Sequence, residues 1–274
     1  MDKIINRHQE ASAMLKATSR TFFIPISRLP EGLKEAVSSA YLCMRAIDEI
    51  EDDPALPSDV KANLLRSSQR ILQQPEADLD RQWTNLMEPH RSRLPEVTLR
   101  MNDWAKLSPP TVRSLVYDKT GIMAKGMADW VCKEWDIRTE EDLDDYTYYV
   151  AGLVGVLLND LWRWYDGTET DEKLAVAYGR GLQAVNIIRN REEDLARGVD
   201  FFPNGWSMEE MFSYARRNLV MADIYTDSIQ SQPILEFCKI PLTLAHGTLR
   251  ALEAGESKLS RFAVKALVKK IIGE

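Results

Sequence analysis

The chain has 274 residues and a formal net charge of −7, because 42 acidic side chains outnumber 35 lysines and arginines. Its 45% of hydrophobic and 28% of charged residues are the balance of a globular protein and exclude a disordered one. The acidic excess argues against nucleic-acid binding, which needs clustered Lys and Arg. It is compatible with a phosphorylated small molecule that binds to the protein by way of a divalent metal ion.

Helical periodicity dominates the chain. Apolar residues recur at three- and four-residue spacing, as they do on amphipathic helices, and Pro54 and Pro95 mark helix ends. Ser207 followed by Glu210 is typical of a capping box that opens a helix. No alternating run is long enough to predict a strand, so we expect one all-α domain over residues 1–274. The predicted helices cover residues 32–53, 58–73, 76–98, 111–135, 140–165, 172–197, 207–228, 233–254 and 259–272.

The sequence also bears on the compartment. The N-terminus lacks the apolar core of a signal peptide, and the longest apolar run, residues 149–158, is about half a bilayer span. Three widely spaced cysteines without a C-x-x-C pair favour free thiols in a reducing compartment. These features predict a cytoplasmic protein. The basic amphipathic stretch 258–272 is explained either as a helix that covers the domain or as a peripheral contact with a membrane.

The first polar stripe with chemical meaning lies near residue 50. On a helix, Tyr41, Arg45, Asp48 and Asp52 fall within an arc of roughly 60°. Two carboxylates one turn apart repel each other, and a hard divalent ion such as Mg²⁺ is their natural partner. Taken alone, such a run is more often a solvated acidic helix end.

A second polar stripe makes a functional site a better explanation than a solvated helix end. Gln183, Asn186, Asn190 and Asp194 fall within an arc of roughly 80° of a helix that also carries isoleucines. Amides beside isoleucines are poor candidates for a solvent face, and buried amides need partners. We therefore expect the two stripes to face each other in a helical bundle, with metal ions between them that bind an anion such as a diphosphate.

Several segments in this order resemble the squalene/phytoene synthases, the family that condenses prenyl diphosphates head to head. The resemblance extends from about Ser19 to Arg261, nearly the whole chain, and the order of the motifs makes it specific. The matching segments are Ser19-x-Thr21-Phe22, Tyr41-x-x-x-Arg45-x-x-Asp48-x-x-x-Asp52, the run YVAGLVG at 149–155, Asn186-x-x-Arg189-Asn190-x-x-Glu193-Asp194, and 237–249.

The resemblance implies a single all-α isoprenoid-synthase bundle with a central active-site cavity. It implies a Mg²⁺-dependent transferase that joins two farnesyl or geranylgeranyl diphosphates, with loss of diphosphate, to a squalene- or phytoene-type product. The implied metal site is formed by Asp48, Asp52, Asn190 and Asp194. Tyr41 and Arg45 join these four as catalytic residues. The implied substrate-binding residues are Ser19, Thr21, Phe22, Tyr41, Arg45, Tyr149, Gln183, Asn186 and Arg189.

One departure from the family pattern keeps alternatives open. Asn190 stands where the second motif begins with Asp, and an amide keeps a ligand oxygen but loses a negative charge. A phosphatase or terpene cyclase acting on one prenyl diphosphate is the enzymatic alternative. A pseudoenzyme subunit or lipid carrier is the other, against which Asp48 and Asp52 argue. NADPH use stays open without a glycine-rich loop, and the sequence fixes neither chain length, final product nor oligomeric state.

Overall fold

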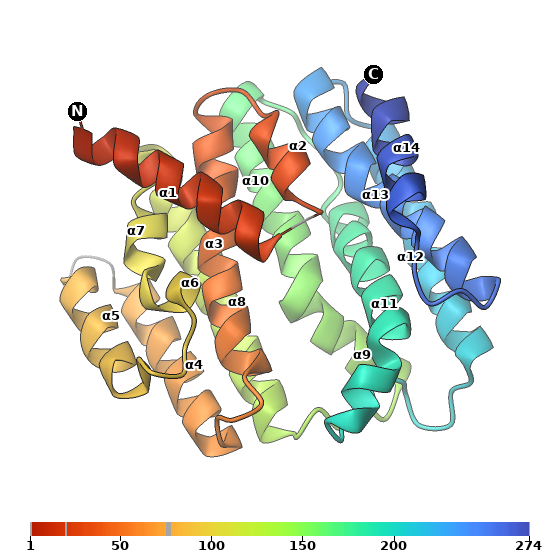
Figure 1. Ribbon diagram of the computed structural model, residues 1–274, viewed down its shortest axis with the longest axis horizontal. Coiled ribbons are helices and arrows are strands. Elements are labelled where there is room, and N and C mark those ends of the chain that lie inside the picture. Colours follow the sequence, from red (N-terminus) through yellow and green to blue (C-terminus); the bar gives the residue numbers. More distant parts are fainter. Residues whose placement is uncertain (1, 20, 75–77, 274) are drawn as a thin grey trace. The chain divides into compact units, whose positions relative to one another are not determined.

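Every regular element among the described residues is helical, and no strand occurs in them (Figure 1). The computed structural model describes residues 2–19, 21–74 and 78–273. The all-α prediction is therefore confirmed. Contacts between helices group the chain into two compact units, Met1–Glu134 and Trp135–Glu274. The prediction of a single domain stays a prediction.

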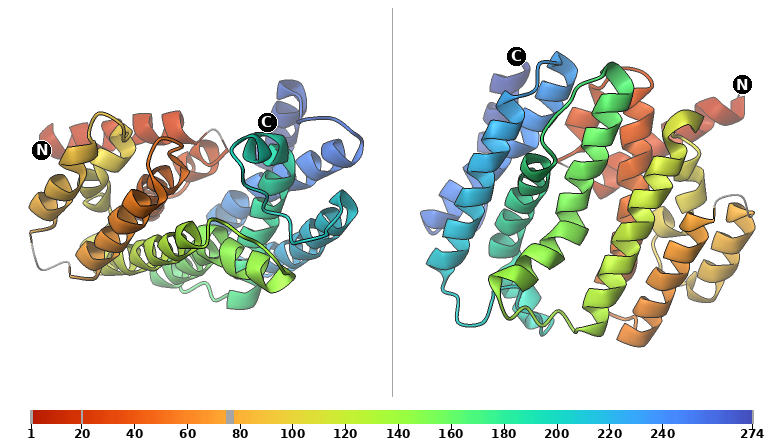
Figure 2. Two further views of the ribbon diagram at one scale, coloured as in Figure 1. Left: turned by 90° about the horizontal axis from the view of Figure 1, so that it is seen from below. Right: turned by 180° about the vertical axis from the view of Figure 1, so that it is seen from behind.

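The first unit consists of helices of very different lengths. In chain order they are α1 (Asp2–Thr18), α2 (Phe23–Ser27), α3 (Leu33–Asp52), α4 (Ser58–Gln73), α5 (Leu79–Met87), the 3₁₀ turn η1 (Glu88–His90), α6 (Glu96–Leu99), α7 (Met101–Ala105) and α8 (Pro110–Cys132). α3 is the central helix, because it contacts α1, α4, α6, α7 and α8. Its apolar side chains Leu42, Ile47 and Ile50 are fully buried. α4 lies alongside α8 (Figure 2).

The second unit is built from longer helices. They are α9 (Glu140–Thr147), the π-helical turn η2 (Tyr148–Gly152), α10 (Leu153–Asp166), α11 (Glu172–Ala196), α12 (Met208–Asp227), α13 (Gln232–Glu253) and α14 (Arg261–Ile272). α11 contacts η2, α10, α12 and α13 and is therefore the central helix of this unit. The predicted capping box is confirmed, because Ser207 accepts from the N–H of Glu210 while the Glu210 carboxylate accepts from the N–H of Ser207.

Close backbone contact holds α11 against η2 and α10. A Cβ placed on Gly155 would lie 2.1 Å from the carbonyl oxygen of Ala175, and one on Gly179 would lie 2.2 Å from that of Ala151. Only glycine allows two helix backbones to approach this closely. The YVAGLVG run therefore has a packing role: it brings the helix with the second polar stripe against its neighbour.

Most predicted helices are confirmed, but the one over 76–98 is wrong as a single element. The described part of that stretch forms α5, η1 and α6, while residues 75–77 lie outside the described residues. Pro89 and Pro95 explain the breaks, because proline lacks the N–H that continues a helix. The predicted helix over 140–165 is interrupted by η2, and the one over 111–135 ends at Cys132. Glu134 and Trp135 follow with left-handed φ angles of 54° and 52°.

Three helices of the first unit carried no usable signal. α2 and α7 have five residues each, shorter than the window in which helical periodicity can be recognised. α1 is mostly polar, and among its described side chains Ala11 and Leu15 are buried. Two buried apolar residues among the described side chains, which cover residues 7–18, are too few to stand out in the sequence.

The last helix, α14, packs against α13 and buries Val268. Its Phe262 is 83% exposed, and Lys265, Lys269 and Lys270 are exposed as well. Among the described residues, no helix combines the length and the apolar character needed to cross a membrane.

Replacing Gly155 with alanine tests the packing of α11. We expect Gly155→Ala to lower the free energy of unfolding by about 2–3 kcal/mol, because the added methyl group meets a backbone oxygen that cannot move away. Gly121→Ala is the matched control: its Cβ would lie 3.6 Å from the nearest atom, inside α8. There alanine should be neutral or stabilise by up to about 1 kcal/mol. Urea unfolding of both variants measures the difference, and equal effects would contradict the packing role.

Candidate functional site

The first polar stripe lies on the partly exposed side of α3. Tyr41, Arg45 and Asp48 are half-buried and Asp52 is exposed, whereas the residues between them are mostly buried. The period of the helix explains this pattern, because apolar side chains occupy the other positions of each turn and pack inward. The structure thus brings these four residues together as predicted.

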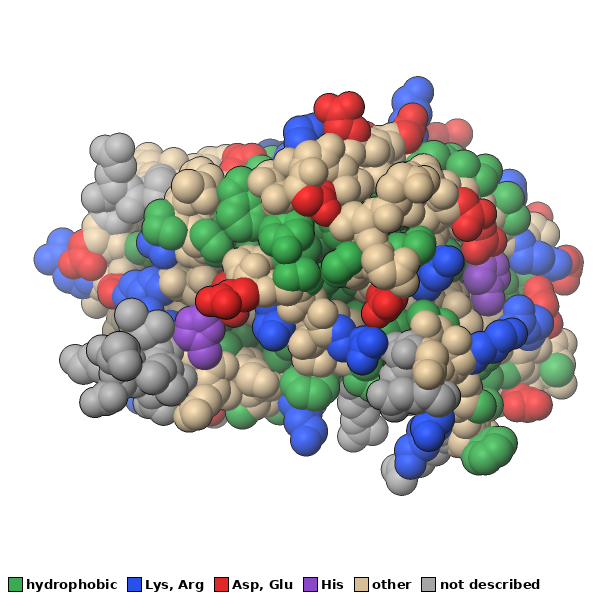
Figure 3. All heavy atoms as spheres, turned by 90° about the horizontal axis from the view of Figure 1, so that it is seen from above, with side chains coloured by type: hydrophobic (Ala, Val, Ile, Leu, Met, Phe, Trp, Pro, Cys, Tyr) green, Lys and Arg blue, Asp and Glu red, His purple; other side chains and the backbone are tan. Residues whose placement is uncertain are grey.

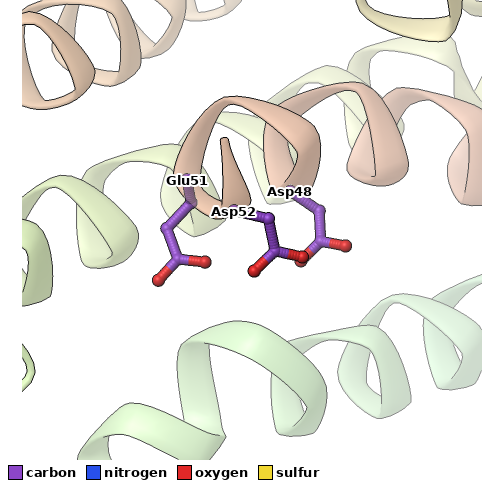
Figure 4. A group of neighbouring side chains, drawn as sticks. All are labelled: Asp48, Glu51 and Asp52. Atoms are coloured by element: carbon purple, nitrogen blue, oxygen red, sulfur yellow. The ribbon is translucent and has the colours of Figure 1, made fainter. Parts of the chain in front are cut away.

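An acidic cluster stands at the end of this stripe. One carboxylate oxygen from each of Asp48, Glu51 and Asp52 can be chosen so that all three lie within 4.8 Å of one another. The three side chains leave the same side of the last turns of α3 (Figure 4). Sequence reasoning missed Glu51, whose residue is only 4% exposed. Its spacing of three from Asp48 was the available signal, because i and i+3 are neighbours on a helix.

The surroundings of Asp48 disfavour its charged form. Burial, and next the negative charge of Asp52, raise the pKa of the Asp48 carboxyl from 3.8 to about 7. Arg45 opposes this shift by donating to the Asp48 carboxylate. A cation bound by the cluster would favour the charged form much more strongly.

Arg45 forms a fork between two acidic residues of its own helix. Besides Asp48, it contacts Glu49, to which Nε donates over 2.8 Å and Nη2 over 2.5 Å. Its side chain keeps 31% of its surface exposed, so part of the guanidinium still faces outward. Arg45 is therefore held in place by the helix that carries it.

The N-terminal motif packs against the start of the stripe. The Tyr41 hydroxyl donates to the carbonyl oxygen of Thr18 over 3.2 Å, and the rings of Phe22 and Tyr41 are 6.0 Å apart. Ser19 is buried, and its hydroxyl accepts from the N–H of Phe22 over 2.9 Å. Burial raises the pKa of Tyr41, so the phenol stays protonated and remains a donor at neutral pH. Thr21, by contrast, is exposed.

The second stripe lies on α11, and its polar groups have partners on that helix or at its C-terminal cap. The amide of Asn186 donates to Gln183 over 3.5 Å, and Nε of Arg189 donates to Oδ1 of Asn190 over 3.0 Å. Asp194 has 11% of its side chain exposed and forms an ion pair with Arg197. Glu193 is exposed.

Tyr149 belongs to η2, the π-helical turn. Its ring lies 5.3 Å from that of Tyr148 in an edge-on arrangement, and both residues are half-buried. π-Helical turns inside helices are often found at functional sites, because they redirect side chains out of the helical register. The substrate-binding role of Tyr149 stays a prediction, and so does the facing of the two stripes.

Comparisons with known proteins identify the family of the chain. The profile of the family described as Squalene/phytoene synthase matches residues 15–210. The squalene synthase of Schizosaccharomyces pombe is 30% identical over 270 residues, covering 87% of this chain and 58% of its own length. That of Solanum lycopersicum is 31% identical over 268 residues, covering 86% of this chain and 62% of its own length. The chain thus spans about three fifths of the length of these relatives.

Solved structures show the same fold. A complex of TcSQS with a ligand superposes with a TM-score of 0.79 at 23% identity, over 97% of this chain and 86% of that one. A dehydrosqualene synthase in complex with a ligand gives a TM-score of 0.59 at 19% identity, over 99% and 97% of the two chains. The predicted isoprenoid-synthase fold is thereby confirmed. Together with the profile match over residues 15–210, these findings establish that the chain belongs to the squalene/phytoene synthase family.

Proposed function

We propose that the chain is a Mg²⁺-dependent prenyltransferase. It joins two molecules of farnesyl or geranylgeranyl diphosphate head to head, with loss of diphosphate, to a product of the squalene or phytoene type. The observation that carries the proposal is the acidic cluster of Asp48, Glu51 and Asp52 beside Arg45, in a chain of this family.

The acidic cluster fits a hard divalent cation. Its three carboxylate oxygens lie within 4.8 Å of one another, a spacing that one ion with oxygen ligands can bridge. Burial, and next the charge of Asp52, raise the pKa of Asp48, and a bound cation would oppose both effects. When bound, Mg²⁺ would neutralise the diphosphate as it leaves the prenyl chain. Asn190 and Asp194 are proposed to complete the metal site from the second stripe.

The remaining residues of the stripes are proposed to bind and orient the substrates. Arg45 is already oriented by Glu49 and can donate its exposed N–H groups to a diphosphate, a charge-assisted contact. Tyr41 supplies a protonated hydroxyl at the start of the same stripe. Gln183, Asn186 and Arg189 would provide further donors from α11.

One observation favours the single-substrate alternative. Oδ1 of Asn190 accepts from Arg189, and Asp194 is paired with Arg197 at the C-terminal cap of α11, so both side chains of the proposed metal site already have a local partner. Within the described residues, the one group of three acidic, His or Cys side chains suited to a metal is the cluster on α3. A chain with one effective metal site would ionise one prenyl diphosphate and let water or an internal double bond capture the cation.

The proposed partners are prenyl diphosphates. On the face drawn in Figure 3, basic side chains are interspersed with acidic ones, which gives nucleic acid no basic patch there. Contact of α14 with a membrane stays a prediction, which the exposed Phe262 and lysines support. Cytoplasmic location also stays a prediction, and the use of NADPH stays open.

Asp48→Ala tests the proposed reaction directly. With Mg²⁺ and farnesyl or geranylgeranyl diphosphate, with and without NADPH, the unchanged protein should release diphosphate and form a C30 or C40 hydrocarbon. Loss of a cation ligand should slow diphosphate release at least about 100-fold. Asp59→Ala, at an exposed position in the first turn of α4, should keep full activity. Mass spectrometry of the products decides: a prenyl alcohol or a C15 or C20 cyclic product supports the alternative, and no turnover favours a pseudoenzyme.

Asn190→Asp tests the departure in the second motif. The substitution restores a negative charge beside Arg189 without changing the size of the side chain. We expect tighter binding of Mg²⁺, seen as a several-fold lower Mg²⁺ concentration at half-maximal diphosphate release. If the Mg²⁺ dependence and the product distribution both stay unchanged, Asn190 is not part of the metal site.

Asp48→Asn tests how the charge of Asp48 affects the free energy of unfolding. Because the folded pKa of Asp48 is raised, its neutral form stabilises the fold fully below about pH 4, and that contribution is lost as the pH rises to about 7. In EDTA at pH 8, the amide should therefore raise the free energy of unfolding by about 1–2 kcal/mol, discounting for the 27% exposure of the side chain. Near pH 4 the gain should vanish, and saturating Mg²⁺ should stabilise the unchanged protein more than the variant. Urea unfolding across this pH range measures the effect; a gain that is independent of pH would contradict it.

A further inference from the structure

A buried cation lies behind the acidic cluster. Lys61, in the first half of α4, is only 7% exposed. Its Nζ donates to the backbone carbonyl oxygen of Glu51 over 2.5 Å. That oxygen belongs to the last turn of α3, where backbone carbonyls have no partner within the helix. Lys61 therefore satisfies an acceptor in the turn that carries Glu51 and Asp52.

The burial of this ammonium group needs an explanation. A charged group taken out of water costs several kcal/mol unless opposite charge and hydrogen bonds compensate it. Compensation is available here, because the C-terminal end of a helix carries partial negative charge and the cluster adds three carboxylates. With Lys61 and Arg45 charged, and with Glu49 and the three carboxylates of the cluster ionised, two negative charges are left over. One divalent cation carries the charge that neutralises them.

The connection between α3 and α4 keeps this arrangement rigid. Oδ1 of Asp53 accepts from the N–H of Ala55 over 2.7 Å and from the N–H of Leu56 over 3.1 Å. The turn after α3 is thereby closed by its own side chain, and α4 begins at Ser58. Lys61 thus reaches back to α3 from a fixed position.

We propose that Lys61 is a positioning residue for the cation site. It holds the last turn of α3, acting through Glu51, so that the carboxylates of the cluster keep the spacing that a divalent ion needs. It touches neither the ion nor the substrate. The inference rests on the proposed function, because it takes the cluster to be the metal site, and it adds a residue that neither the motifs nor the acidic cluster contains.

The test measures metal affinity in the absence of substrate. Full-length protein is titrated with Mn²⁺ alone, with free Mn²⁺ followed by electron paramagnetic resonance, and Asp52→Ala identifies the part of the binding that belongs to the cluster. Lys61→Met should weaken that binding by about 10- to 100-fold, the usual effect of removing a group that orients metal ligands. Lys61→Arg, which keeps the charge and the donors, should retain most of the affinity.

Lys106→Met is the matched control. Lys106 forms an ion pair with Asp80 of α5, elsewhere in the same unit, so its loss should lower stability but leave Mn²⁺ affinity unchanged. If folded Lys61→Met binds Mn²⁺ as tightly as the unchanged protein, the positioning role is wrong while the proposed function stands. If the unchanged protein shows no binding that Asp52→Ala removes, the proposed metal site itself fails. Should Lys61→Met not fold, Lys61→Gln is titrated instead, with the same criteria.

Discussion

Repulsion among carboxylates on one helix is the constraint around which the first unit is arranged. Asp48, Glu51 and Asp52 stand at the C-terminal end of α3, where unpaired carbonyl groups already concentrate negative charge. Arg45 offsets this charge from the stripe itself, and Lys61 does so from α4. Even so, the pKa of Asp48 is raised. A fold that keeps such repulsion in place is typical of a functional site, where stability is given up for binding.

In the second unit, the polar side chains of the stripe have partners close by in the chain. Asn190 accepts from Arg189 of the same helix, and Asp194 pairs with Arg197, the residue that caps its C-terminal end. The backbone contact at Gly155 fixes α11 against α10 without using any of these polar groups. Packing and polar chemistry thus occupy different parts of the length of α11: the close contacts lie at Ala175 and Gly179, and the stripe begins at Gln183. This separation allows the stripe to change in sequence, as at Asn190, while the helix keeps its place.

Much of this could be read from the sequence, since it follows from local rules. The predicted helix over 58–73 coincides with α4, which starts directly after Pro57, and helical periodicity placed Asp48 and Asp52 together. Glu51 was missed because it lies outside the narrow arc of the stripe, although its spacing of three from Asp48 places the two carboxylates side by side. The hydrogen bond from Tyr41 to Thr18 joins residues 23 positions apart, and no local pattern encodes such a contact. Between residues 76 and 98, the prediction also overlooked that Pro89 and Pro95 divide the stretch into short helices.

The amide at position 190 also changes what Arg189 can do. An aspartate there would form an ion pair with the guanidinium and cancel its charge, whereas Asn190 offers Arg189 only a neutral acceptor. Arg189 is exposed and keeps its full positive charge for another partner. A diphosphate is such a partner, since guanidinium groups match phosphate oxygens in geometry and charge. On the proposed function, the two stripes would then hold their anions differently: α3 through a cation that its carboxylates attract, and α11 to a greater extent through its own donors. On this reasoning, the amide at position 190 has two linked effects: it removes a negative charge that would bind metal, and it leaves the positive charge of Arg189 able to bind phosphate.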